Sequence, residues 1–109
     1  TKVYLFGGCM NQTGDWAFND NFALTAPADK DGEWVSPAFT GSAELRASVK
    51  VGDLDWYRTE FTIYKGDLFW RRYDIPNNWA ETEGAAYSVT TQVGQKLYIN
   101  FDTYKAEVK

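Results

Sequence analysis

The stretch FTIYKGDLFW, residues 61–70, decides the fold. Two runs of strand-forming residues flank Lys65-Gly66, and a two-residue turn ending in glycine between such runs is typical of a β-hairpin. Side chains alternate between the two faces of a strand, so Phe61 and Ile63 are expected to face a core together. The stretch therefore predicts two neighbouring antiparallel strands.

Short segments of the same kind recur along the chain, and none shows a helical repeat over ten or more residues. We expect strands near 2–6, 22–26, 33–39, 43–51, 57–64, 67–73, 86–92, 95–101 and 103–108. The turn Val93-Gly94 predicts a second hairpin, between YSVTTQ and QKLYINF. So many short antiparallel strands indicate an all-β domain over residues 1–109, an immunoglobulin-like antiparallel β-sandwich ahead of a small barrel.

Alternation also assigns the side chains of the other strands to faces. In AELRASVK (43–50), the core face carries Leu45, Ala47 and Val49. The opposite face carries Glu44, Arg46, Ser48 and Lys50, so Arg46 and Lys50 are expected on one outward strip. Near the C-terminus the core face carries Leu97, Ile99 and Phe101, and the outer face carries Tyr98 and Asn100.

Composition excludes several classes of function. The net charge is −4 and no basic run interrupts the sequence, which disfavours nucleic acid as a partner. Histidine is absent and Cys9 is the only cysteine, so the chain cannot form an internal disulfide, and the common zinc sites and His-based hydrolase arrangements lack their residues. Cys9 is expected to be a buried free thiol, and we expect no cofactor.

Aromatic residues are the unusual feature of the composition. There are 5 Trp, 7 Tyr and 7 Phe, or 17% of the chain, too many for one small core, so some rings are expected at the surface. Trp34 is expected in the core, whereas Trp16, Trp56 and Trp79 stand in polar, turn-rich segments. Flat rings stack on the C–H faces of sugars, whose hydroxyls need donors and acceptors nearby. Candidates for that role are Arg46, Lys50, Arg58, Arg71 and Asn77.

A series of motifs carries a family resemblance. YLFGG, a GDW turn, DGEW, ELRASVK, DWYRTEFTIYKGDLFWR and GQKLYINF, in this order, resemble the carbohydrate-binding domains of SusE/SusF-type starch-binding outer-membrane lipoproteins. The resemblance implies an immunoglobulin-like module without catalysis that binds α-glucan through an aromatic cradle and basic or amide side chains. Carried over, it implies stacking by Trp16, Trp56 and Tyr57 and hydrogen bonding by Arg46 and Lys50.

The resemblance also implies a setting. The chain would be one module of a longer multidomain lipoprotein at the cell surface, attached to the membrane only through a lipid anchor outside this segment. Partners would be an oligosaccharide or polysaccharide and other outer-membrane glycan-uptake proteins. After Arg71 the chain departs from the family pattern with RYDIPNNWAETEGAAY, whose Trp79 and Asn77 could extend the sugar site, block it or suit another glycan.

Two other classes of function, a glycosidase and a calcium-binding protein, are less consistent with the sequence. A glycosidase would need two carboxylates among Asp53, Asp55, Glu60 and Glu44, but acidic pairs in turns are usually solvated, and a small sandwich leaves little room for a cleft. The stretch DKDGE (29–33) lacks the third ligand and the closing Glu of a calcium loop. A structural spacer or a protein-docking domain without its own sugar site stays open as the alternative.

Overall fold

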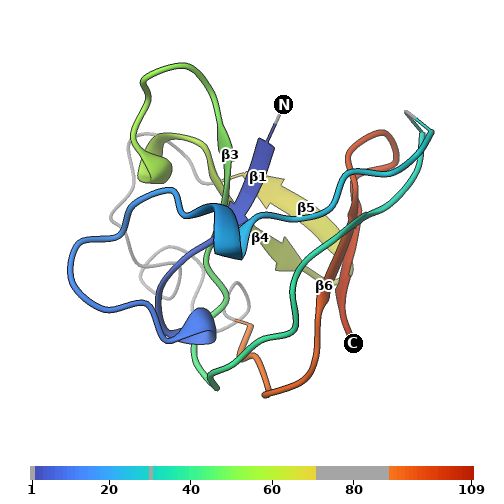
Figure 1. The fold of residues 1–109 in the computed structure, drawn as a ribbon. Coiled ribbons are helices and arrows are strands. Elements are labelled where there is room, and N and C mark those ends of the chain that lie inside the picture. Colours follow the sequence, from blue (N-terminus) through green and yellow to red (C-terminus); the bar gives the residue numbers. More distant parts are fainter. Residues whose placement is uncertain (1, 30, 71–88) are drawn as a thin grey trace.

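The computed structural model describes residues 2–29, 31–70 and 89–109, and within them the all-β prediction is confirmed (Figure 1). The strands are β1 (Lys2–Leu5), β2 (Trp34–Val35), β3 (Ala47–Lys50), β4 (Glu60–Tyr64), β5 (Asp67–Trp70), β6 (Leu97–Asn100) and β7 (Lys105–Val108). Three 3₁₀ turns accompany them: η1 (Gly7–Met10), η2 (Asp20–Phe22) and η3 (Trp56–Arg58). None of these helical segments is long and apolar enough to cross a membrane.

The seven strands form one antiparallel sheet in the order β1-β3-β4-β5-β7-β6-β2. The sheet curls so that its two halves enclose a common core, which gives the sandwich-like arrangement expected from the sequence. Between the halves, β5 and β7 share a single register pair, Asp67 with Lys105. At the opposite limits of the sheet, Ala23 forms a bridge to Tyr4 in β1 and Thr25 forms a bridge to Val35 in β2. Residues 23–25 therefore link the two edge strands.

The hairpin of residues 61–70 is confirmed. Tyr64 is paired with Asp67, and Lys65 and Gly66 have φ of 52° and 84°. A type I′ turn requires positive φ at both central residues, so the Lys-Gly pair adopts the geometry that suits twisted strands.

The second predicted hairpin is wrong. Both edges of β6 are occupied, one by β2 and the other by β7. Of the expected strand at 86–92, only 89–92 lies in the described part, and there Thr90 forms a bridge to Glu44. The turn at Val93-Gly94 exists, with Gln95 N donating to Gln92 O at 3.1 Å, but it leads the chain from one half of the sheet to the other.

Several expected strands are shorter than predicted because local turns replace their ends. The segment 22–26 contains the end of η2 and the two bridges, and the Asn19 side chain caps η2 by accepting from Asn21 N at 2.9 Å. Strand β4 begins at Glu60, since η3 occupies the preceding residues. β2 retains two residues of the expected 33–39.

The core assignments are confirmed where they rest on alternation. Leu45, Ala47, Phe61, Ile63, Leu97 and Ile99 are all buried between the halves. Val49, Phe101 and Trp34 are partly buried and pack against the same cluster. Tyr98 and Asn100 are half-buried on the outer face of β6.

The outward strip predicted for β3 is wrong at Arg46, which is only 9% exposed, whereas Lys50 is exposed. Alternation correctly places Arg46 and Ser48 on the face opposite the core, but that face is not open. A second aromatic layer covers it, made of Tyr4, Phe6, Trp16, Phe18 and Trp56. Two of its rings come from the segment between η1 and η2, which folds back across the β1–β3–β4 half (Figure 1).

Candidate functional site

Three rings of the second aromatic layer and its margin reach the surface together, and we refer to Trp16, Trp56 and Tyr57 as the aromatic platform. The Trp16 and Trp56 rings lie 5.0 Å apart between centroids and are tilted by 52°. Tyr57 stands nearly perpendicular to Trp56, at 87° and 5.7 Å. The two tryptophans are half-buried and Tyr57 is 40% exposed, so each ring keeps a support and an accessible part.

The segment carrying Trp16 is fixed by a close approach to the backbone. Gly7 has φ of +73°, and a Cβ at this position would lie 2.6 Å from Trp16 Cζ2. Gln12 ties the segment down, because its Oε1 accepts from Gly7 N at 2.8 Å and its Nε2 donates to Ala17 O at 3.0 Å. Trp16 therefore packs where only glycine leaves room.

Two contacts fix the position of Trp56, one at its ring and one at its carbonyl group. Its ring lies 5.7 Å from Phe6, tilted by 31°, and Phe6 is fully buried. Its carbonyl accepts a 2.6 Å hydrogen bond from Ser48 Oγ on β3. These contacts place Trp56 at the first residue of η3, directly over the β3 face.

An ion-pair triad of Glu44, Arg46 and Glu60 lies beside the platform, with Arg46 and Glu60 buried and Glu44 partly exposed. Arg46 Nη1 donates to Glu60 Oε1 at 2.8 Å, and Nη2 donates to Glu44 Oε2 at 3.1 Å. The Glu60 side chain is 0% exposed. The Arg46 guanidinium also lies over the Trp16 ring, 5.8 Å from its centroid, within range of a cation–π contact.

Two further cations lie over aromatic rings, one in the second aromatic layer and one in the platform. Lys50 Nζ lies 5.6 Å from the centroid of Phe18, which itself packs on Phe6. The Arg58 guanidinium lies 5.6 Å from the centroid of Tyr57. Arg58 is therefore the charged donor beside the platform, and Lys50 lies beside the second aromatic layer.

The structure brings together four of the predicted site residues: Trp16, Arg46, Trp56 and Tyr57. Lys50 lies over Phe18 of the second aromatic layer. The other three, Arg71, Asn77 and Trp79, lie outside the described residues. Sequence reasoning did not identify Gly7, Phe6 and Phe18 as supports of the platform. The alternation of aromatic residues in Tyr4-Leu5-Phe6 and Trp16-Ala17-Phe18 was a signal that this second layer exists.

Two of the acids considered for catalysis, Glu44 and Glu60, both bind Arg46. Asp53 and Asp55 are exposed in the segment before η3, whereas Glu60 is buried and bound to Arg46. A glycosidase needs two carboxylates on either side of a bound sugar. Within the described ranges, no group of three or more His, Cys, Asp or Glu side chains is arranged to hold a metal ion.

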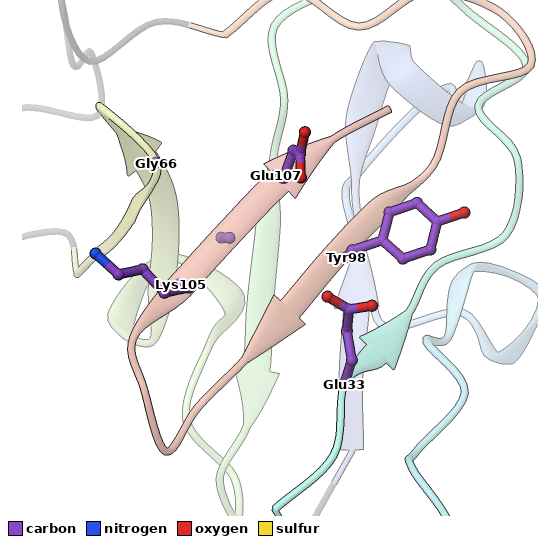
Figure 2. A pocket seen from close by; sticks show the side chains of 6 residues that line it. Glu33, Gly66, Tyr98, Lys105 and Glu107 are labelled. Atoms are coloured by element: carbon purple, nitrogen blue, oxygen red, sulfur yellow. The ribbon is translucent and has the colours of Figure 1, made fainter.

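Two hollows of the described surface do not include the platform rings in their linings. One, of about 380 Å³, is lined on the outer face of β6 and β7 by Glu33, Gly66, Tyr98, Lys105, Ala106 and Glu107 (Figure 2). The other, of about 680 Å³, follows residues 11–22 without including Trp16 in its lining. The platform rings therefore line neither of these two hollows.

Two buried ionisable groups have raised pKa values. Burial raises the pKa of the Cys9 thiol, and Cys9 Sγ donates to Phe6 O at 3.2 Å, which confirms the buried free thiol. Burial also raises the pKa of Tyr4, as does its 2.9 Å hydrogen bond to Asp20 Oδ1. Neither group adds charge under the rings at neutral pH.

Comparisons with known proteins agree on one family. The family model described as SusF/SusE starch-specific CBMs, that is, carbohydrate-binding modules, matches residues 2–107. Outer membrane protein SusF of Bacteroides thetaiotaomicron is 33% identical over 103 residues, covering 92% of this chain and 19% of the relative. The crystal structure of SusF from the same organism matches with a TM-score of 0.82 and 28% identity, over 99% of this chain and 23% of that one. The chain therefore spans about a fifth of the length of this curated relative.

Proposed function

Because the chain belongs to the SusF/SusE family of starch-specific carbohydrate-binding modules, we propose that it binds an α-glucan on the aromatic platform. Modules of this family bind without catalysis, and the chain is not an enzyme. The observation that carries the proposal is the Trp16–Trp56 pair, 5.0 Å apart and half-buried, with Arg58 over the neighbouring Tyr57 and Lys50 over Phe18.

The angle within the pair supports a curved ligand. Two rings tilted by 52° face two directions, so they suit consecutive sugar units that are turned relative to each other. Chains of α-1,4-linked glucose curve in this way, whereas β-1,4-linked chains are extended. Lys50 and Arg58 supply the charged donors that sugar hydroxyls require.

The proposal includes three residues from the segment after β5. Arg71 follows that strand directly, and Asn77 and Trp79 follow in the same polar sequence. Their side chains have the chemistry that sugar binding requires. Arg71 has a guanidinium donor, Asn77 has an amide and Trp79 has a ring for stacking. We assign them to the same sugar site.

The relative named outer membrane protein SusF supports an outer-membrane setting. We extend this to the extracellular face, where the chain would act as one module of a longer protein held by a lipid anchor outside this segment. Its partners there would include other outer-membrane proteins of glycan uptake. Localising an epitope-tagged full-length protein on intact cells with and without external protease tests this placement.

Isothermal titration with maltoheptaose and with cellohexaose tests the function. The native domain is expected to bind maltoheptaose and not cellohexaose. Trp16→Ala and Trp56→Ala should each weaken binding about fivefold, since one stacked ring contributes on the order of 1 kcal/mol. Tyr104→Ala is the matched control, because Tyr104 is 53% exposed and belongs to neither the platform nor its supports. A folded native domain without affinity for either glucan refutes the proposal.

A second candidate is a docking or spacer role, favoured by the segment before Trp56. Val51 and Leu54 are 49% and 47% exposed there, beside the 40% exposed Tyr57. Exposed apolar side chains so close together are typical of contact surfaces. Sedimentation velocity of the isolated domain separates the two functions: self-association abolished by Leu54→Ser, without affinity for glucan, establishes docking.

A further inference from the structure

We propose that Glu60 is a positioning residue of the sugar site: acting through Arg46, it fixes the angle at which Trp16 lies beside Trp56. The inference deepens the proposed function and rests on it for its effect on affinity. It concerns a residue that does not reach the surface and does not touch the ligand.

The Arg46–Glu60 pair of the triad is buried. The Arg46 side chain is 10% exposed and the Glu60 side chain is 0% exposed, so both charges are removed from water. Moving two charges out of water costs more than their attraction often returns, and apolar replacements of such pairs are frequently neutral or stabilising. Stability alone therefore gives little reason for an ion pair at this position.

The two carboxylates that bind Arg46 fix the orientation of its guanidinium. Glu60 is paired in register with Ser48, so it lies diagonally across from Arg46 on the same face of β3 and β4. Arg46 is bound at both terminal nitrogens, at 2.8 Å by Glu60 and at 3.1 Å by Glu44. A planar guanidinium held at two nitrogens has a fixed plane, which a point charge such as lysine would not have.

The guanidinium of Arg46 contacts the Trp16 ring of the platform. The fixed guanidinium lies over the Trp16 ring at 5.8 Å, while another side of that ring meets the backbone at Gly7. Trp16 therefore has a backbone contact that limits its approach and a cationic plane that sets its tilt. Glu60, through Arg46, determines the 52° angle between the two tryptophans.

The variant Glu60→Gln tests this chain of contacts, because it keeps the side-chain shape and removes the charge. We expect maltoheptaose affinity to fall about fivefold, as for other coupled neighbours. We also expect loss of the far-ultraviolet circular dichroism couplet that two tryptophans at 5.0 Å produce by exciton coupling. A residue with a purely structural role would not change that couplet in a folded protein.

Controls separate positioning from general destabilisation. Ile63→Val removes a methylene from the buried core, and it should lower the melting temperature while leaving affinity and couplet unchanged. Asp67→Asn makes the same chemical change in the exposed pair with Lys105 and should alter neither readout. If Glu60→Gln does not fold, Glu44→Gln takes its place, because Glu44 is 33% exposed and holds the other nitrogen of Arg46.

The outcomes distinguish this inference from the proposed function. An unchanged couplet in a folded Glu60→Gln or Glu44→Gln variant overturns the inference, and so does an equal loss in Ile63→Val. If the native domain binds no glucan, the proposed function fails, and the couplet still decides whether Glu60 positions Trp16.

Discussion

Replacing Gly7 by alanine is expected to displace Trp16 and weaken both the fold and the sugar site. Gly7 has φ of +73°, where an L side chain costs about 1–2 kcal/mol. The new Cβ would also lie 2.6 Å from Trp16 Cζ2, so the ring must move by about 0.8 Å to reach the 3.4 Å of ordinary contact. Such overpacking adds roughly 1–3 kcal/mol.

Gly94→Ala provides the matched control for the free-energy cost of an L side chain at positive φ. Gly94 has φ of +92°, and a Cβ there would meet nothing within 4 Å. Urea unfolding of both variants should therefore show a larger loss of stability for Gly7→Ala, by about 1–3 kcal/mol. Only the Gly7 variant should change the tryptophan fluorescence of the native state.

Titration with maltoheptaose completes the test. A ring moved away from its stacking position loses on the order of 0.5–1.5 kcal/mol, so Gly7→Ala should bind roughly two- to tenfold more weakly. Gly94→Ala should bind like the native domain. Equal stability and equal affinity in the two variants would refute the packing of Trp16 on Gly7.

Two further predictions concern the margin and the interior of the site. Lys50→Met keeps the apolar stem and removes the charge, so glucan affinity should fall about threefold or more while stability changes by less than about 0.5 kcal/mol; unchanged affinity would remove Lys50 from the site. Burial raises the pKa of Cys9 above its usual 9.0, so the thiol should resist Ellman's reagent at pH 8 until the domain is unfolded, and rapid labelling of the native protein would contradict its burial. The same shift means that the contribution of Cys9 to stability is complete below pH 9 and declines as the pH rises through the higher folded-state pKa, which urea unfolding at pH 8 and pH 10 measures.

Local pattern was sufficient to predict the hairpin and most of the core. The Lys65-Gly66 turn specifies its own geometry, and alternation places Phe61 and Ile63 inside without reference to distant residues. The hairpin at Val93-Gly94 was wrong for the complementary reason. β6 pairs with β2 and β7. No local sequence signal indicates which of several possible strands will pair with it.

The site shows the same division between local and long-range information. Trp16 and Trp56 were identified from their polar surroundings and from the family motifs, although they lie 40 residues apart in sequence. Arg46 was placed on the correct face, but its burial depends on a segment that folds back from residues 11–22. Alternation reports the face of a strand and contains no information on whether another segment covers it.

The link through residues 23–25 has a consequence for how such modules can be joined in one polypeptide. An edge strand with open backbone groups can pair with a strand of a neighbouring copy, which exchanges segments or starts aggregation. Here Ala23 and Thr25 bridge the two edge strands to each other within the same module. These bridges occupy backbone groups of both edge strands, which leaves fewer of them open to a strand of a neighbouring copy.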